Sequence, residues 1–263
     1  MKIAVLYIGT GSYSSFWKDF YSSSEEYFLL NHLKHYFVFT DDKSIKSNDN
    51  ITTIFKKCEG FPNDSLFRFK IFLKIKSELE KFDYIFFFNS NMKFITNVDD
   101  SFLPKNNLFE NGLLGVLHPG HYNKSVFWYP YDRNSNSKAF IPFKINKSYH
   151  YFMGGVNGGR SFQYLKLIET CANNIDEDLK EGYIAKYHDE SHLNKYFYEN
   201  KCKIVGPEYG WIEGKITPLH IKIIIRDKTK INTKFKKQST NILIRIINLF
   251  FHINNSFMWI IFS

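Results

Sequence analysis

Cysteine is scarce in this 263-residue sequence, which contains only Cys58, Cys171 and Cys202. The three are odd in number, far apart in the chain and without Cys-x-x-Cys spacing. This pattern excludes a disulfide framework and a cysteine-rich zinc site, and it indicates buried thiols in a reducing compartment. Internal repeats and low-complexity linkers are absent as well. We therefore expect one large domain, with or without extensions, for which 44% hydrophobic residues supply an ample core.

A secretory leader and a complete dinucleotide fingerprint are also lacking. The apolar run at residues 3–8 is too short for the core of a signal peptide, and no small-residue cleavage site follows it. We expect this run to form the first strand, and the protein to be cytoplasmic. The turn after it contains Gly9 and Gly11 but not the full Gly-x-Gly-x-x-Gly motif, which argues against a dinucleotide cofactor.

The chain has a net positive charge, and most of this excess comes from the C-terminal part. The net charge is +9, and eight basic residues with a single acid, Asp227, lie from Lys222 onward. The remaining 27 basic and 25 acidic residues make the body of the chain nearly neutral. The many Phe and Tyr residues occur in strand-like and helix-like runs and are not interleaved with Lys and Arg. We therefore expect no nucleic-acid partner.

Strand-like apolar runs alternate with helix-spaced segments through the first part of the chain. Strands are expected at residues 3–8, 35–40, 51–55 and 84–88, and helices at residues 16–30 and 63–82. The second half has a weaker periodicity, with strands at residues 112–118, 139–141 and 221–225, helices at residues 161–171 and 189–198, and a glycine cluster at residues 154–159. This order predicts an α/β fold with a mainly parallel, Rossmann-like sheet covered by helices on both faces.

Two of the predicted strands end in polar segments that should open into one crevice, because ligands of such sheets bind beyond the carboxyl ends of the strands. The first strand is followed by Gly9-Thr10-Gly11-Ser12-Tyr13 and the fourth by Asn89-Ser90-Asn91. A nucleotide fits this place. Tyr13 can stack on its base, although simple packing explains an aromatic residue there equally well.

The Asn89-Ser90-Asn91 segment lies where metal-dependent transferases carry an Asp-x-Asp pair. Amides bind a hard divalent cation more weakly than carboxylates do, so these residues indicate a transferase without a metal, or else a plain turn. The leaving diphosphate would then need fixed positive charge. Arg226 and Lys228 directly follow the strand at residues 221–225 and can supply it, unless they form a solvated or lipid-facing basic run.

Glu190 is the candidate for the reactive group. It lies at a predicted helix start, where the helix dipole favours the ionised carboxylate that a nucleophile or a cation stabiliser must have. A transition state that resembles an oxocarbenium ion gains from a carboxylate on one face. The alternative is that Asp189 or Glu190 merely caps the helix.

The sequence resembles the family 6 glycosyltransferases, which include the histo-blood-group A and B transferases, the α-1,3-galactosyltransferase and metal-independent bacterial relatives. The resemblance is collinear from Ile3 to about Lys228 and is most specific in an eleven-residue string, Tyr187-His188-Asp189-Glu190-Ser191-His192-Leu193-Asn194-Lys195-Tyr196-Phe197. Further matching segments are Gly11-Ser12-Tyr13, Asp64-Ser65-Leu66-Phe67-Arg68, Ala139-Phe140-Ile141-Pro142, Met153-Gly154-Gly155 with Gly158-Gly159, and Gly206-Pro207-Glu208-Tyr209-Gly210-Trp211.

The resemblance implies a GT-A fold over residues 1–228. It also implies the retaining transfer of galactose or N-acetylgalactosamine from a UDP-sugar to a galactose 3-hydroxyl, with Glu190 as the reactive carboxylate. Asp189 would hold the donor sugar and Tyr13 would contact uracil. The other expected donor contacts are Ile8, Gly9, Thr10, Arg68, Asn89, Ser90, Asn91, Met153, Gly154, Gly155, His188, Arg226 and Lys228. Expected acceptor contacts are His118, Tyr187 and Trp211, and no metal or other cofactor is expected.

Departures from the family pattern bear on the two sugars. Asn89-Ser90-Asn91 replaces the vertebrate Asp-x-Asp, as in the bacterial branch. Tyr129-Pro130-Tyr131 and Trp211-Ile212 differ from the blood-group enzymes, so we expect only that the acceptor is a galactose-terminated, fucosylated glycan or a lipopolysaccharide precursor. Gly155 favours N-acetylgalactosamine, whereas Met153 resembles the galactose-using form; we take N-acetylgalactosamine as the expected donor sugar. The alternatives are a non-catalytic carbohydrate-binding protein on this fold and a basic, membrane-associated interaction protein.

The tail at residues 229–263 has no counterpart in the family pattern. Polar residues recur every three or four positions along an otherwise apolar helix, at Asn241, Arg245, Asn248, His252 and Asn255. A basic segment precedes this helix, so we expect it to associate peripherally with an anionic membrane surface on the cytoplasmic side. Packing on the domain is the alternative. A spanning helix is disfavoured because polar residues would lie within it.

Overall fold

The N-terminal apolar run forms strand β1 (Lys2–Ile8) in the computed structural model, which describes residues 1–231 and 242–262. β1 lies inside a seven-stranded sheet with the order β3-β2-β1-β4-β7-β6-β8. The other strands are β2 (Leu33–Thr40), β3 (Ile51–Phe55), β4 (Tyr84–Asn89), β6 (Leu113–Leu117), β7 (Phe152–Arg160) and β8 (Lys203–Val205). All run in one direction except β7, which is antiparallel to both of its neighbours. The predicted, mainly parallel sheet is confirmed.

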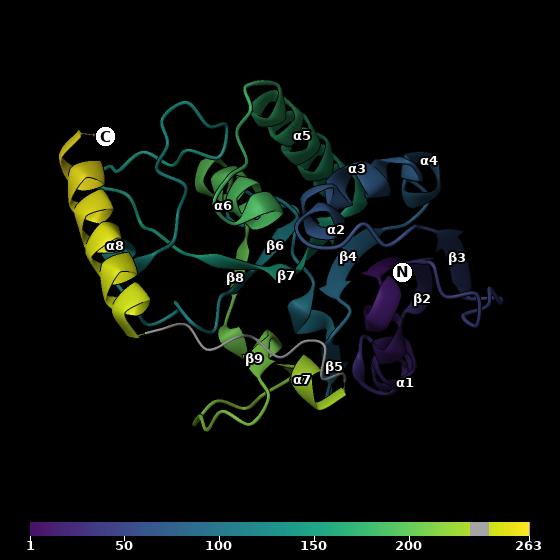
Figure 1. Cartoon of the computed structure of the whole chain (residues 1–263). Coiled ribbons are helices and arrows are strands. Elements are labelled where there is room, and N and C mark those ends of the chain that lie inside the picture. The colour runs from purple at the N-terminus through teal and green to yellow at the C-terminus, as the bar shows by residue number, and fades with distance from the viewer. Residues whose placement is uncertain (232–241, 263) are drawn as a thin grey trace.

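Helices cover both faces of this sheet, because its strands are apolar on both sides (Figure 1). Helix α1 (Trp17–Tyr27) follows a 3-10 turn at Gly11–Phe16 and packs on one face, where Phe20 contacts Tyr7. Helices α3 (Arg68–Leu73), α5 (Ser161–Lys180) and α6 (His188–Glu199) pack on the other face. The GT-A-like α/β architecture that the sequence predicts is therefore present.

A small second sheet joins the C-terminal half to the end of β4. It consists of β5 (Met92–Phe94), β10 (Ile223–Ile225) and β9 (Trp211–Ile212), with β10 antiparallel to β5 and parallel to β9. Just beyond it the backbone amide of Arg226 donates to the carbonyl of Asn91 at 2.8 Å, before helix α7 (Lys228–Ile231) begins. The C-terminal cations are thereby brought to the carboxyl ends of β1 and β4.

The glycine cluster at residues 154–159 forms β7, a strand that the sequence did not predict because glycine is rare in strands. Neighbouring backbones approach it too closely for side chains. A Cβ at Gly158 would lie 2.5 Å from the carbonyl oxygen of Ile85, and one at Gly159 would lie 2.3 Å from that of Gly112. Glycine is therefore needed where β7 pairs with β4 and β6.

Three element boundaries differ from the prediction. The helix expected at residues 63–82 is divided into α2 (Asn63–Leu66), α3 and α4 (Lys76–Leu79), in a stretch whose aromatic and β-branched residues favour a continuous helix only weakly. Residues 139–141 form no strand; an isolated bridge joins Phe140 to Asp132 instead. The helix expected at residues 161–171 is longer and ends at Lys180. Short 3-10 turns occur at Asp100–Phe102, Val126–Trp128 and Pro207–Tyr209.

Helix α8 (Ile242–Phe262) confirms the expected C-terminal helix and lies at one edge of the domain (Figure 1). It packs on the segment around Val126–Trp128 and Ile141, as the alternative of packing on the domain requires. Within the described parts of the chain, no helix has the length and apolar character needed to cross a membrane. Asn241 of the expected polar stripe and most of the basic segment lie outside the described residues.

Candidate active site

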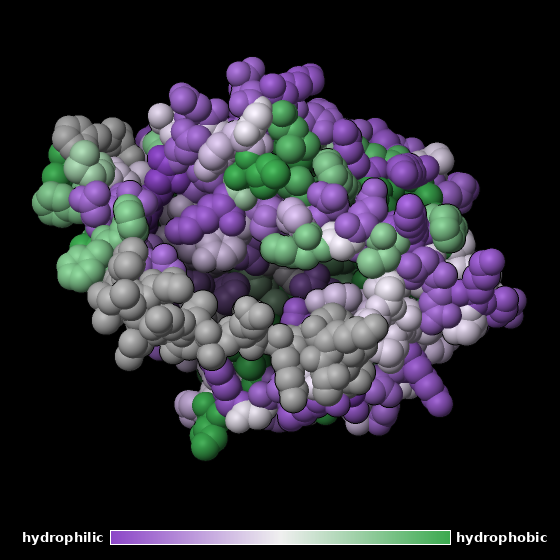
Figure 2. All heavy atoms as spheres, viewed as in Figure 1, coloured by the Kyte–Doolittle hydropathy of each residue, from purple (hydrophilic) through white to green (hydrophobic). Residues whose placement is uncertain are grey.

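The carboxyl ends of β1 and β4 lie side by side, since Ile8 is paired in register with Asn89. Beyond them is a cavity of about 410 Å³, and Figure 2 shows this face of the molecule hollowed near its middle. Of the predicted donor contacts, those that line the cavity are Ile8, Thr10, Tyr13, Arg68, Asn89, Ser90, Asn91 and Lys228. Eight of the predicted donor contacts therefore lie around one cavity, and their role in binding a donor stays a prediction.

One end of the cavity is formed by residues from the two ends of the chain. The Nζ of Lys228 donates to the phenol oxygen of Tyr13 at 2.9 Å. Thr10 is buried and its hydroxyl donates to Asp64 at 3.2 Å. Asp64 also accepts the backbone amide of Gly60 at 3.0 Å, which fixes the loop opposite Tyr13. Tyr13 supplies an aromatic ring and Lys228 a cation, so this end of the cavity is suited to bind a nucleotide base and a phosphate.

The amides that follow β4 have different surroundings. Asn91 donates its side-chain amide to the carbonyl of Arg226 at 3.1 Å and so joins β4 to the C-terminal segment. Asn89 is exposed to the cavity, and a Cβ at Gly155 on β7 would lie 2.9 Å from its Nδ2. Gly155 therefore adjoins the cavity, as predicted. Among the described residues no cluster of three His, Cys, Asp or Glu side chains is arranged to hold a metal ion.

Arg226 lies farther from the cavity than the sequence suggested. Its Nη1 makes a 2.7 Å ion pair with Asp19 on α1, and its guanidinium stands over the ring of Phe16. Within the described part of the chain, Arg226 is not among the residues that line the cavity. Lys228 is the nearer cation.

A buried ion pair forms the wall between the cavity and α6. Nη2 of Arg68 lies 2.7 Å from Oδ2 of Asp189, and the two side chains are only 4% and 7% exposed. Nη1 of Arg68 donates to the carbonyl of Gly154 at 2.8 Å. Burial raises the pKa of Asp189 to about 6, and the charge of Arg68 opposes this rise. Arg68 thus reaches from the cavity to the segment that the resemblance singles out.

Glu190 is held by two hydrogen bonds to its carboxylate. The phenol of Tyr151 donates to Oε1 and the backbone amide of Gly154 donates to Oε2, each at 2.6 Å. A Cβ at Gly154 would lie 3.2 Å from Oε2, so glycine allows this close approach. These are contacts across the fold, and the carboxylate does not cap α6, whose first turn instead has Ser191 accepting from the amide of Tyr187 at 2.9 Å.

The environment of Glu190 balances two effects on its charge. Burial raises the pKa of Glu190, while the hydrogen bonds from Tyr151 and Gly154 and the charge of Arg68 lower it. Asn194, one turn along α6, donates to the carbonyl of Glu190 at 2.9 Å and also bonds the backbone of Phe152. The carboxylate is thereby fixed in position beside β7. Such a group can act as a nucleophile or stabilise a positive charge that develops close by.

Of the predicted acceptor residues, His118 lies beside Tyr151. The ring of His118 is 5.7 Å from that of Tyr151, and its Nδ1 accepts the amide of Gly120 at 3.0 Å. Burial lowers the pKa of His118 to about 4, which makes it neutral near pH 7. Tyr187 is 43% exposed, and Trp211 is buried with its Nε1 donating to the carbonyl of Lys215 at 2.9 Å.

Three further predicted donor contacts, His188, Met153 and Gly9, are not among the described residues that line the cavity. His188 adopts a left-handed backbone conformation, with φ of 50°, and its ring packs edge-on against Phe61 at 4.9 Å. Met153 is buried, and its Cε lies 3.1 Å from the place of a Cβ at Gly155. The amide of Gly9 donates to the carbonyl of Phe39 at 2.9 Å, so Gly9 serves the β1–β2 pairing.

Tyr151 and Phe61 are the important residues that the sequence did not single out. Tyr151 bonds the carboxylate of Glu190, and Phe61 lines the cavity. The chain has 17 Tyr and 28 Phe, and neither residue occurs in a spacing that distinguishes it from the others. Asn194 belongs to the eleven-residue string that resembles the family. It follows Glu190 by four residues, and this spacing places both residues on the same face of α6.

Comparisons with known proteins agree with this geometry. A family model described as glycosyltransferase family 6 matches residues 1–238. The O-antigen biosynthesis glycosyltransferase WbnI of Escherichia coli is 36% identical over 234 residues, which are 88% of this chain and 96% of the relative. Histo-blood group ABO system transferase 2 of Rattus norvegicus is 29% identical over 209 residues, 76% of this chain and 60% of the relative. Globoside alpha-1,3-N-acetylgalactosaminyltransferase 1 of Gallus gallus is 28% identical over 234 residues, 85% of this chain and 66% of the relative.

Proposed function

The chain belongs to glycosyltransferase family 6 and is a glycosyltransferase, and we propose that it transfers N-acetylgalactosamine from a UDP-sugar to a galactose 3-hydroxyl with retention of configuration. The acceptor in this proposal is a galactose-terminated, fucosylated glycan or a lipopolysaccharide precursor. The observation that carries the proposal is the carboxylate of Glu190, held at 2.6 Å by both Tyr151 and Gly154 beside a cavity of nucleotide size.

The donor is proposed to lie along the cavity from Tyr13 to Arg68. Tyr13 would face the uracil, and the cation of Lys228 beside it would compensate the diphosphate, with Arg226 behind it. Asn89 and Gly155 adjoin each other near the Arg68 end, where the sugar would lie. Asp189 would hold the sugar, since Arg68 fixes its carboxylate at that end.

In the proposed reaction, Glu190 and the acceptor hydroxyl act on opposite faces of the sugar ring. Glu190 would face the anomeric carbon on the side opposite the leaving UDP, either attacking it covalently or stabilising a short-lived oxocarbenium ion. The acceptor hydroxyl would then attack from the side that UDP leaves. Tyr151 connects Glu190 to His118, so a galactose against these residues would meet the donor at the reacting carbon.

Glycan mass spectrometry tests this function. The purified protein is incubated with UDP-N-acetylgalactosamine or UDP-galactose and a panel of galactose-terminated acceptors, fucosylated and not. We expect the mass of one N-acetylhexosamine to be added to a fucosylated acceptor. If the protein binds these sugars but adds neither an N-acetylhexosamine nor a hexose to any acceptor, the proposed transfer is wrong. The alternative, a non-catalytic carbohydrate-binding protein, would then hold.

We propose that the transfer needs no divalent metal. Amides stand at Asn89 and Asn91, and the latter is already bonded to the backbone of Arg226, so a hard cation would lack the carboxylates it prefers. Turnover in excess EDTA should equal turnover with added Mn²⁺ within about twofold. A loss of turnover in EDTA that Mn²⁺ restores would contradict this prediction.

Gly155→Ala should shift the donor preference toward galactose. The added methyl would lie 2.9 Å from Nδ2 of Asn89 and would take space beside the proposed sugar site. A steric difference of this size changes selectivity by roughly 10- to 200-fold. The measured quantity is the ratio of kcat/KM for the two UDP-sugars, because general damage would lower both values and leave the ratio unchanged. An unchanged ratio would remove Gly155 from the sugar site.

Activity should fall as the pH is lowered through about 6, the pKa of Asp189. The pKa of Asp189 is raised to about 6 and that of Glu190 is also raised, so both carboxylates take up protons at a higher pH than free carboxyl groups do. Protonation weakens the Arg68–Asp189 ion pair and removes the charge that Glu190 needs. The pH profile of kcat/KM checks this, and a flat profile down to about pH 5 would contradict it.

A further inference from the structure

One face of α8 packs on the domain. Of the predicted polar stripe, His252 approaches the carbonyl of Phe127 at 3.1 Å, whereas Asn248 and Asn255 are exposed. The indole Nε1 of Trp259 donates to the carbonyl of Ile141 at 2.7 Å, and the hydroxyl of Ser256 donates to the carbonyl of Phe127 at 3.0 Å. Ser256 is fully buried and Trp259 is 4% exposed. The guanidinium of Arg133 stands 4.8 Å from the Trp259 ring and also bonds Ser256. These contacts fix the rotation of the helix about its own axis.

The opposite face of α8 is apolar and turned outward, which is the reverse of a helix on a water-soluble surface. The face comprises Leu249, Phe250, Phe251, Ile253, Phe257, Met258, Ile260 and Ile261, which are between 36% and 69% exposed. Exposed Asn254 lies among these residues. Figure 2 shows hydrophobic residues gathered at the edge of the molecule where α8 lies. We call this surface the outer face of α8.

Two further features indicate what covers the outer face. Trp128 is 40% exposed and stacks on His252 beside α8 with ring centroids 5.5 Å apart, and tryptophan is enriched where membrane and water meet. The chain from Lys228 to its end contains six basic residues and no acidic one. Positive charge next to an apolar helix face complements an anionic lipid surface. A second copy of the chain is a poorer fit, because it would bring two basic segments together.

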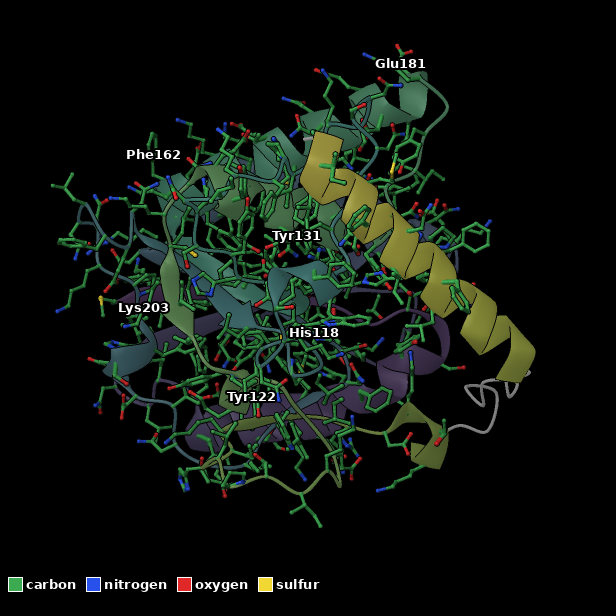
Figure 3. All side chains as sticks on the ribbon, turned by 90° about the vertical axis from the view of Figure 1, so that its left-hand side faces the viewer. His118, Tyr122, Tyr131, Phe162, Glu181 and Lys203 are labelled. Carbon is green, nitrogen blue, oxygen red and sulfur yellow. The ribbon has the colours of Figure 1, made fainter. Side chains whose placement is uncertain are left out.

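The helix is also connected to the reaction centre. Trp259 packs on Tyr131 with ring centroids 6.2 Å apart, and Figure 3 shows Tyr131 close to α8. Tyr131 packs in turn on Tyr151, with ring centroids 5.6 Å apart. Tyr151 donates to Glu190. The element with the outer face therefore lies on the acceptor side of the site.

We infer that α8 lies in the surface of an anionic bilayer through its outer face, and that this docking holds the acceptor side of the site against lipid-linked glycans. The acceptor part of this inference rests on the proposed function. The bilayer part rests only on the exposed outer face of α8, the neighbouring Trp128 and the basic sequence that precedes the helix.

Vesicle binding tests the bilayer part without any measurement of activity. The full chain is sedimented with phosphatidylcholine vesicles that contain or lack phosphatidylglycerol. The double variant Phe250→Ser/Phe257→Ser changes the outer face; Phe109→Ser/Phe162→Ser, which are both 78% exposed elsewhere, is the matched control. We expect wild type and control to bind the anionic vesicles, and the outer-face variant to bind them at least about tenfold more weakly. Equal binding of the two variants would overturn the inference. So would a wild-type dimer, seen by analytical ultracentrifugation, that the outer-face variant disrupts.

A comparison of two acceptors tests the connection with catalysis. One fucosylated galactose glycan is offered free in solution and attached to lipid in anionic vesicles. The outer-face variant should retain wild-type turnover of the free glycan and lose at least about tenfold on the lipid-attached one. Equal loss on both acceptors would make α8 part of the folded core and overturn the inference. Vesicle binding by a wild-type protein that transfers to neither acceptor would refute the proposed function and leave the bilayer part standing.

Discussion

Replacing Glu190 by glutamine is expected to lower kcat by at least about a thousandfold, which corresponds to about 4 kcal/mol of lost transition-state stabilisation. Glutamine keeps the size of the side chain. Its carbonyl oxygen can still accept from the amide of Gly154, and its NH2 group can donate to the phenol oxygen of Tyr151. It lacks the negative charge that a nucleophile or a stabiliser of an oxocarbenium ion must have. Binding of UDP should change little, because Glu190 is outside the cavity that the nucleotide is proposed to occupy.

Steady-state kinetics and calorimetric titration with UDP measure the two quantities separately. Glu199→Gln is a suitable control, since Glu199 lies on the same helix and its side chain, which is 52% exposed, forms an ion pair with Lys195 at 2.9 Å. The control should retain wild-type kcat. A Glu190→Gln protein with more than about a tenth of wild-type kcat would show that the reactive carboxylate lies elsewhere.

Arg68→Met is expected to destabilise the fold by about 3–5 kcal/mol, because it leaves the carboxylate of Asp189 buried without its counter-charge. The Arg68–Asp189 pair is nearly inaccessible to water, and Arg68 also bonds the carbonyl of Gly154. The same substitution should abolish transfer, since it unfixes the carboxylate proposed to hold the sugar. Urea unfolding measures the loss of stability.

Two further variants separate the charge from the packing. Lys76→Met removes an ion pair with Glu169 whose side chains are 42% and 43% exposed, and it should cost less than about 1 kcal/mol. Adding Asp189→Asn to Arg68→Met removes the stranded charge and should recover part of the lost stability. If the double variant is no more stable than Arg68→Met, the cost comes from lost packing against Phe87 and not from the buried carboxylate.

The parts of the fold that could be predicted are those with a local signal. Continuous apolar runs predict β1 and β4, and parallel pairing then requires that Ile8 and Asn89 end at the same edge, as they do. β7 could not be predicted, because its glycines are required by the backbones of Ile85 and Gly112, which are distant in the sequence. Strand propensity reflects only the residue itself. In β7 the residue type is determined by the backbones of the adjacent strands, which leave no room for a side chain.

In the candidate site, too, features with a local sequence signal could be predicted, and features set by distant residues could not. The helix start at Glu190 was legible from the sequence, but its hydrogen bond to Tyr151 depends on how β7 packs on α6. Arg226 followed a predicted strand, yet its ion-pair partner, Asp19, is 207 residues away and nothing local indicates it. The periodicity of α8 likewise predicted a polar stripe. The face that packs inward is set by the carbonyls of Phe127 and Ile141, which accept from Ser256 and Trp259 outside that stripe.

The most direct test of the account is the configuration of the new glycosidic bond, read by NMR from the product of a UDP-α-sugar and a fucosylated galactose acceptor. We proposed that Glu190 faces one side of the donor sugar and that the acceptor enters from the other. That arrangement predicts an α linkage to the galactose 3-hydroxyl. A β linkage would mean that the acceptor attacks from the face assigned to Glu190. That result would contradict the central claim.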